Sequence, residues 1–433
     1  MMNLRTKIIT CLILLVQPLH AQDVLTLEQV VNMALKNNFD IQVARSEADI
    51  DKVNNTAGNA GMLPGVAVNG TYSKSSISLD QKLSNGTDIS KPNASSSNIN
   101  SNVTLSWTVF DGFKMFVTKR KLNEIETLGE LQFKESVMQT VYDVTVAYYN
   151  LVKQKQQLAS LQEVINYNNE RVKILQTSFN AGLTAKNSLL QARIDLNVFS
   201  ENALNQQSVI QSARRNLNGL LNQSPEKMFE VSDSIPIYDL PANDTILQRL
   251  QDNNLTYQAS KQQVEISKLA VKEYNSQRYP RLTINGLYNF TQTNNSAGYQ
   301  LYNKTVGPQF GGTISIPVFQ GGNNVRQVKV AKLQYNSSVY NMESTSLKLR
   351  IQFQNAITDF ENQKKLLMIE LDNDALAKEN LEISLQRLRL GQTTELEVKL
   401  AQESFVDSRT RLINFMFNVK VAETKLKQLM AEL

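Results

Sequence analysis

The chain contains few of the residue types on which nucleophilic catalysis and metal binding usually depend. Its one cysteine is Cys11 and its one histidine is His20. Both lie in a segment with the pattern of a secretory signal peptide, in which two basic residues precede an apolar run (Ile8–Val16) and Ala21 marks the cleavage site. The mature chain would then have neither a thiol nor an imidazole. We therefore expect no catalytic residue, no metal ligand and no cofactor, and predict that the protein is not an enzyme.

Charge and hydropathy exclude two further classes of protein. The formal charge is +5, and removal of Arg5 and Lys7 with the signal peptide leaves 5 − 2 = +3. Because no block of basic residues occurs, nucleic acid is not expected as a partner. After the signal peptide no uncharged apolar run reaches 18 residues, so a helical membrane protein is not expected either.

Two short patterns occur twice at the same spacing. Phe110-Asp111-Gly112 returns as Phe319-Gln320-Gly321, and 321 − 112 = 209. The segment Phe179–Thr184 returns in reduced form as Leu388–Thr393, where the glycines give 391 − 182 = 209. A repeat of this length is too long for a solenoid unit. It indicates two copies of one large structural half.

Each half is predicted to contain a helix, a strand pair and a long helical hairpin. Strands are indicated by alternating apolar and polar residues, as in Val103–Val109, and the hairpins by long stretches without proline. A stripe of apolar residues at every seventh position predicts coiled-coil-like packing of the first hairpin: Val144, Leu151, Leu158, Ile165, Val172 and Phe179. The predicted segments are a signal peptide (1–21), a first repeat (22–222, strand pair 65–111, hairpin 113–221, tip near 182), an equatorial connector (223–243) and a second repeat (244–433, strand pair 281–319, hairpin 324–432, tip near 391).

The four predicted strands have the length and alternation of strands in an outer-membrane barrel. Four strands cannot close such a barrel, and an open sheet edge in lipid leaves backbone groups unpaired. Chains must therefore pool their strands, and three chains would supply about twelve. Six aromatic residues in or beside the strands are expected to form the interfacial girdle, with ordinary strand packing as the alternative for each: Tyr72, Trp107, Phe110, Tyr288, Phe290 and Phe319.

The chain resembles the outer-membrane efflux protein family of TolC-like outer-membrane channels. The resemblance spans nearly the whole mature chain. It depends on the duplicated plan, the strand ends Val109–Gly112 and Val318–Gly321, the turn Phe179–Leu183, and Gln191-Ala192-Arg193 after that turn. It implies a mainly α fold with β strands, in a homotrimer whose shared 12-strand β-barrel lies in the bacterial outer-membrane lipid and continues into a periplasmic α-helical barrel.

The resemblance also implies a function and partners. The protein would be a passive exit duct of a tripartite efflux pump or a type I secretion system, coupled to an inner-membrane pump through a periplasmic adaptor protein. The alternatives are a periplasmic adaptor and a coiled-coil scaffold of the cell envelope. Two hairpins argue against an adaptor, and the strands argue against a scaffold.

Two sets of residues take their roles from this resemblance. The two hairpin tips would dock the adaptor: Gly182, Leu183, Thr184, Gly391, Gln392 and Thr393. A plain helix end also explains the two glycines, and both interpretations can hold. Positions six residues beyond the tip glycines would constrict the pore, namely Ser188 and Glu397. Three copies of Glu397 would favour cations. Alternatively, Glu397 forms a capping box with Thr394, because the two have its three-residue spacing.

Overall fold

The computed structural model describes residues 24–238 and 252–433. The predicted signal peptide lies outside the described residues, and so do residues 239–243 of the predicted connector. The chain divides into two compact units. The helical unit contains the described parts of Met1–Arg45, Phe133–Leu255 and Leu347–Leu433, and the strand unit contains Ser46–Gln132 and Thr256–Ser346.

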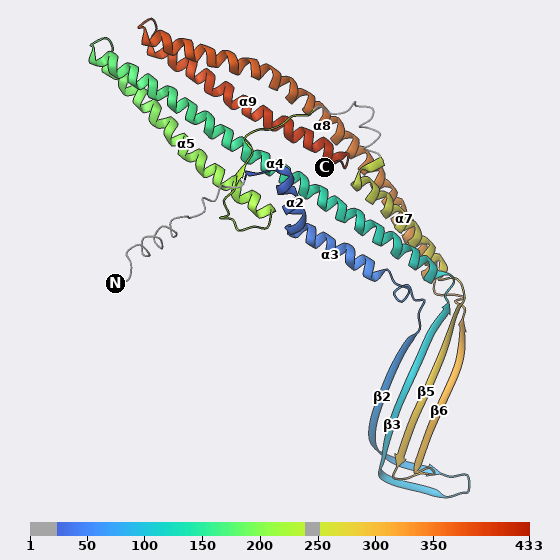
Figure 1. Ribbon diagram of the computed structural model, residues 1–433. Coiled ribbons are helices and arrows are strands. Elements are labelled where there is room, and N and C mark those ends of the chain that lie inside the picture. Colours follow the sequence, from blue (N-terminus) through green and yellow to red (C-terminus); the bar gives the residue numbers. More distant parts are fainter. Residues whose placement is uncertain (1–23, 239–251) are drawn as a thin grey trace, which may run out of the picture. The chain divides into compact units, whose positions relative to one another are not determined.

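The two predicted repeats are visible in the order of the elements (Figure 1). The first half contains β1 (Val24–Leu25), α2 (Leu27–Asn37), α3 (Phe39–Asn54), β2 (Gly65–Lys82), β3 (Asp88–Phe110), α4 (Lys114–Asn180) and α5 (Lys186–Leu220). The second half follows β4 (Glu230–Val231) and contains α7 (Leu255–Ser276), β5 (Arg281–Asn295), β6 (Tyr302–Ser315), α8 (Asn323–Arg389) and α9 (Glu395–Leu429).

The strand unit contains one antiparallel sheet in the order β2-β3-β5-β6. Its register places side chains in rows that cross all four strands, and partners in a row share a face. One row is Val68, Val103, Tyr288 and Pro308, and the next row on the opposite face is Asn69, Asn102, Asn289 and Gly307. Rows of apolar side chains and rows of polar side chains alternate in this way along the sheet. One face is therefore apolar, and the other carries mainly Asn, Thr and Ser. We call these the apolar face and the polar face.

Large side chains on the apolar face are exposed to solvent. Val68 is 78% exposed, Phe310 80% and Ile314 69%. Within the described ranges, no strand pairs with the outer edge of β2 or of β6. The sheet therefore has an uncovered apolar face and two unpaired edges.

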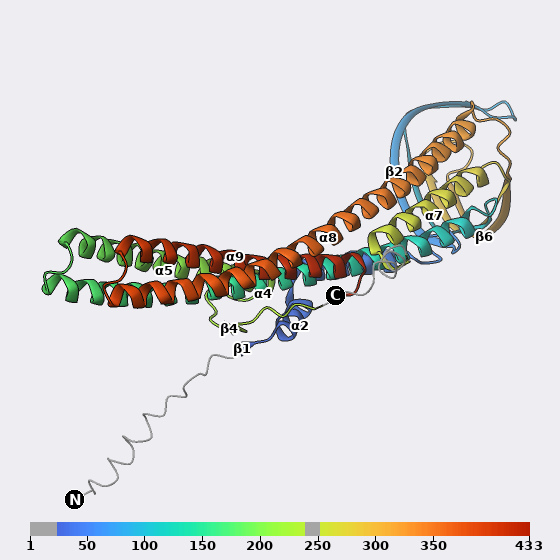
Figure 2. The ribbon, with the colours of Figure 1, turned by 90° about the horizontal axis from the view of Figure 1, so that it is seen from above.

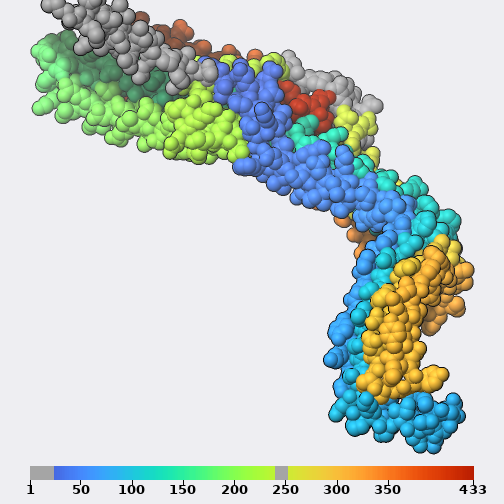
Figure 3. Space-filling model, turned by 60° about the horizontal axis from the view of Figure 1, so that its bottom comes forward, coloured from blue at the N-terminus to red at the C-terminus, as the bar shows by residue number. Residues whose placement is uncertain are grey.

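The ends of the sheet differ. At the helix end, the strands adjoin α4, α7 and α8; at the turn end lie the β2–β3 and β5–β6 turns. The β2–β3 hairpin is longer and bends across the β5–β6 turn, as the blue and orange segments of Figures 1 and 3 show. The bend lies at a bulge between Ile77 and Leu79, opposite Asn93, whose φ is 60°. Lys91 Nζ anchors the bent part by donating to the Ser296 carbonyl over 2.9 Å.

One strand ends earlier than the sequence predicted. The pattern placed the second strand pair over 281–319, but β6 ends at Ser315. Pro317 follows, and proline cannot donate a ladder hydrogen bond, which accounts for the early end. Phe319 therefore lies outside the sheet.

The helical unit is built from the hairpins α4–α5 and α8–α9, which lie side by side in Figure 2. Toward the tips, Val164 on α4 packs with Leu381 on α8 and Phe405 on α9 in one buried cluster. The predicted seven-residue stripe is buried at Val144 and Leu151. Beyond Leu158 the buried positions on α4 are different from those predicted: Val164, Asn168, Arg171 and Leu175.

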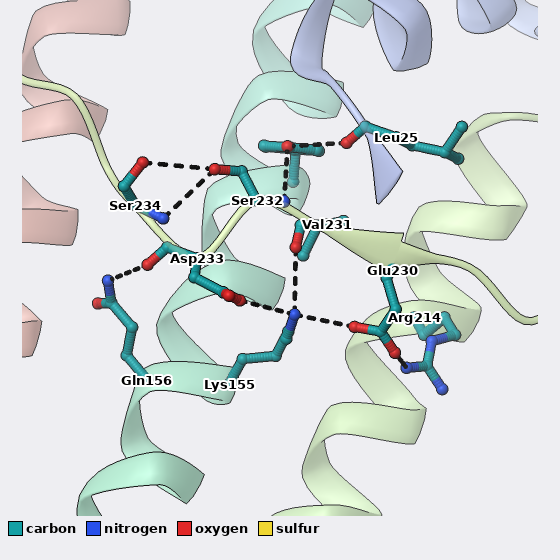
Figure 4. Close-up of polar contacts among 10 residues, drawn as sticks. Leu25, Lys155, Gln156, Arg214, Glu230, Val231, Ser232, Asp233 and Ser234 are labelled. Atoms are coloured by element: carbon teal, nitrogen blue, oxygen red, sulfur yellow. Dashed lines mark hydrogen bonds and ion pairs between the residues drawn. The ribbon is translucent and has the colours of Figure 1, made fainter. Parts of the chain in front are cut away.

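The predicted connector contains a short strand that is fastened to the first hairpin. β4 pairs in parallel with β1, and the Tyr148 hydroxyl donates to the Leu25 carbonyl over 2.9 Å. Lys155 Nζ contacts the carboxylates of Glu230 and Asp233, each at 2.8 Å, as Figure 4 shows. Burial lowers the pKa of Lys155, but the hydrogen bonds to these two carboxylates outweigh it and raise the pKa above its usual value.

None of the helices in the described residues combines the length and hydrophobicity needed to cross a membrane.

Candidate functional site: the helical tips and the sheet faces

The two helical tips have the same backbone geometry. Gly182 and Gly391 adopt φ values of 74° and 70°, a region that glycine occupies without steric cost. Leu183 N–H donates to the Ser178 carbonyl, and Gln392 N–H donates to the Arg387 carbonyl, both over 2.8 Å. These are the Schellman hydrogen bonds of a helix C-terminus, formed at both tips at the repeat spacing of 209 residues.

The helices that follow the tips begin differently. The Thr394 hydroxyl accepts the Glu397 N–H over 3.3 Å and caps α9, whereas Ala185 at the same place before α5 provides no side-chain cap. The Glu397 carboxylate does not complete a capping box. It accepts a hydrogen bond from Arg387 Nη1 over 2.6 Å and another from the Thr393 hydroxyl. The sequence thus predicted the helix start correctly but not the partners of this carboxylate.

The predicted docking and constriction residues lie at the tips. Leu183 is 81% exposed, and the Glu397 side chain is 46% exposed. Ser188 is partly buried in the first turn of α5. Their roles in docking and in constricting a pore stay predictions.

A buried ionic cluster below the tips was missed by the sequence analysis. The Arg171 side chain on α4 is fully buried and contacts Asp195 on α5 at 3.0 Å. It also pairs with Glu395, the first residue of α9. On the surface nearby, Arg389 on α8 pairs with Glu170 on α4. The Arg171–Glu395 and Arg389–Glu170 pairs join the two hairpins, whereas the Arg171–Asp195 contact lies within the first. The one signal for the cluster in the sequence is that Arg171 lies seven residues after Val164.

Five of the six predicted girdle residues lie on the apolar face of the sheet: Tyr72, Trp107, Phe110, Tyr288 and Phe290. Phe319 is 84% exposed in the segment after β6. Trp107 lies near the helix end of β3. Tyr72 pairs with Ile99 of the same strand, which lies eight residues before Trp107, toward the turn end. At 3.3 Å per residue the two rows are about 26 Å apart along the strand. A girdle stays a prediction.

In the described parts of the chain, no group of three or more His, Cys, Asp and Glu side chains is placed to hold a metal ion.

Comparison with known proteins identifies the family. The outer membrane efflux protein family matches residues 30–223 and 246–432. No curated protein sequence matches the chain. Among solved structures, the chain resembles the outer membrane protein VceC of Vibrio cholerae with 17% identity and a TM-score of 0.77, covering 93% of this chain and 95% of that one.

Two further structures show the same fold. The CmeC outer membrane channel of Campylobacter jejuni is 17% identical, with a TM-score of 0.78 and coverage of 94% of this chain and 85% of that one. The open state of the MtrE outer membrane channel of Neisseria gonorrhoeae is 16% identical, with a TM-score of 0.74 and coverage of 93% and 88%.

The chain belongs to the outer membrane efflux protein family. It is therefore an outer-membrane protein of the TolC-like channel class, as the repeated sequence patterns predicted.

Proposed function

We propose that three copies of this chain form an exit duct through the outer membrane, whose helical part extends into the periplasm. The observation that carries the proposal is the sheet, which has one exposed apolar face, one polar face and two unpaired edges. An open edge in lipid is strongly unfavourable because its backbone groups lack partners. Pairing β6 of one copy with β2 of the next removes every edge. Three copies supply about twelve strands, within the range of known barrels.

The two faces then acquire distinct roles. The apolar face with its aromatic residues contacts lipid, and the polar face lines the lumen. Side-chain hydrogen bonds on the polar face, such as Asn69 Nδ2 to Asn102 Oδ1 at 2.9 Å, are compatible with a water-filled interior. The chain thus acts as a passive conduit.

The tips are the proposed docking site for a periplasmic adaptor, which couples the duct to an inner-membrane pump. Both tips expose leucine side chains, with Leu183 81% and Leu390 69% exposed. Exposed leucines at a rigid turn suit docking of an apolar surface. Leu183→Asp should abolish copurification of the adaptor and leave the trimer intact. Normal adaptor recovery would exclude docking at this tip.

Two adjacent residues on opposite faces test the membrane assignment. Phe310→Lys places a charge on the apolar face, and Gln309→Lys places the same charge on the polar face. In lipid, the first substitution should cost about 2–4 kcal/mol and reduce the yield of heat-sensitive trimers in the outer-membrane fraction. The second should be tolerated. In a water-exposed sheet both would be harmless, so equal trimer yields would contradict the proposal.

Channel formation separates the duct from the alternatives. Purified trimers should give conductance steps in planar bilayers and should need detergent to stay in solution. A water-soluble monomer without conductance would instead support an adaptor or a coiled-coil scaffold.

A further inference from the structure

The polar face of the sheet is almost free of charge. In the region shared by all four strands, two charged residues occur, Lys74 and Lys304. A third, Arg281, lies beyond this region, where only β5 and β6 are paired. The two lysines fall in rows of the apolar face at the turn end. Arg281 is the first residue of β5 and shares the polar face with Ser315 and Thr108 at the helix end. The charge on the polar face is thus concentrated at one level.

A hollow of about 610 Å³ opens at this level within the strand unit. Arg281 and Lys114 line it, together with the carboxylates of Asp111 and Glu273. The rest of the lining includes the polar side chains of Thr108 and Gln277 and the apolar residues Ala60 and Pro317. A hollow of this size and polarity accommodates a small hydrated solute.

The carboxylates of the hollow are already engaged by the protein. Asp111 Oδ1 accepts the Met115 N–H over 3.0 Å, in the first turn of α4. Glu273 accepts the Thr118 hydroxyl over 3.0 Å and pairs with Lys121. Both negative charges are therefore partly compensated within the strand unit.

The two cationic side chains that line the hollow, Arg281 and Lys114, have N–H groups available for a ligand. Arg281 Nη2 donates to the Thr108 hydroxyl over 2.9 Å, which fixes one edge of the guanidinium and leaves its other N–H groups. Lys114 forms no ion pair with any described residue. A guanidinium and an ammonium that line the same hollow are suited to a carboxylate or phosphate group.

We propose that this hollow binds an anionic group, one per chain, and that Arg281 and Lys114 are its ligands. Its position in the lumen rests on the proposed duct. There, the three sites of a trimer would form a ring that binds carboxylate- or phosphate-bearing cargo where the lumen passes from the helical part into the uncharged part of the barrel. Binding itself needs only the strand unit of each chain.

Inorganic tripolyphosphate is the probe, titrated into the detergent-solubilised full-length protein by calorimetry at low salt. We expect one site per chain. Arg281→Gln and Lys114→Gln should each weaken binding by about tenfold or more, because each removes a charge-assisted contact. Lys304→Gln removes a cation from the apolar face of the same sheet and should leave the affinity unchanged.

A further variant separates charge from local structure. Thr108→Val removes the hydroxyl that orients Arg281 but retains the charge, so binding should persist with a modest loss. Absence of binding to the wild-type protein, or equal loss in Lys304→Gln and Arg281→Gln, would overturn the proposal. Normal binding by a protein that forms no channels would instead refute the duct and leave this site in place.

Discussion

Arg171 on the first hairpin and Glu395 on the second form an ion pair that the internal repeat does not duplicate. The residue equivalent to Glu395 is Lys186, since 395 − 209 = 186, and the residue equivalent to Arg171 is Asn380, since 171 + 209 = 380. The first hairpin thus provides the cation and the second the anion. The two halves have similar backbones at the tips but different polar contacts.

This pair predicts an unusual order of mutational effects. The Arg171 side chain is fully buried, and its Nε and Nη1 atoms have no hydrogen-bond partner among the described residues. Glu395→Ala leaves that cation with Asp195 alone and should cost about 1–3 kcal/mol. Arg171→Met removes the unsatisfied donors and leaves carboxylates that are partly exposed, so it should cost less. Hydrogen exchange of the first turns of α9 measures both, and a greater loss of protection in Arg171→Met would contradict the argument.

The first turns of α5 and α9, which follow the two tips, should respond in opposite ways to substitution of the N-cap residue. Thr394→Ala removes the hydroxyl that accepts the Glu397 N–H and should destabilise the start of α9 by about 1 kcal/mol. Ala185→Thr introduces the missing cap before α5 and should stabilise that helix start by a similar amount. Amide exchange rates at residues 186–189 and 395–398 provide the measurement. No change at either helix start would show that the tips are held by other contacts.

The repeated glycines Gly112 and Gly321 should differ in their tolerance of alanine. Both have positive φ, 73° and 60°, so alanine at either is strained by about 1–2 kcal/mol. A Cβ at Gly112 would also lie 2.6 Å from Tyr279 Cβ, whereas a Cβ at Gly321 would meet no atom within 4 Å. Gly112→Ala should therefore reduce the yield of folded protein far more than Gly321→Ala. Equal yields, measured as heat-sensitive trimers, would argue against this close approach.

The sequence predicted the elements and their order because strands and helices leave periodic signals. The alternation around Trp107 and the repeated glycine turns each depend on a few adjacent residues. The burial of Arg171 was not predictable in this way, because the periodic signal of a helix core comes from apolar residues and a charged residue does not contribute to it. Its partners are 24 and 224 positions away and are brought close by the packing of the hairpins. The partners of Glu397 were missed for a related reason, since Arg387 reaches it across a tip.

Glu370 on α8 predicts acid sensitivity of the second hairpin. Burial alone would raise the pKa of this carboxyl group, but hydrogen bonds from Arg411 and Ser408 on α9 outweigh burial and lower the pKa below its usual value. The stabilisation is therefore present above the unfolded pKa of about 4.3 and is lost as the pH falls through the lower folded value. Glu370→Gln should make the thermal stability of the hairpin less dependent on pH below about pH 5. Glu379→Gln changes an exposed residue of the same helix and should retain the wild-type dependence.

Glu397 and Arg387 predict opposite changes in ion selectivity if the tips constrict the duct. Three Glu397 carboxylates around a narrow axis would favour cations, but each accepts a hydrogen bond from Arg387 at 2.6 Å, which partly neutralises it. Glu397→Gln should therefore lower the potassium-to-chloride permeability ratio, and Arg387→Gln should raise it, each by about severalfold. Ser188→Glu, which adds a carboxylate at the equivalent place in the first repeat, should also raise the ratio. Reversal potentials in a potassium chloride gradient across planar bilayers measure all three, and changes of the same sign for Glu397→Gln and Arg387→Gln would show that Glu397 acts only in the structure of the tip.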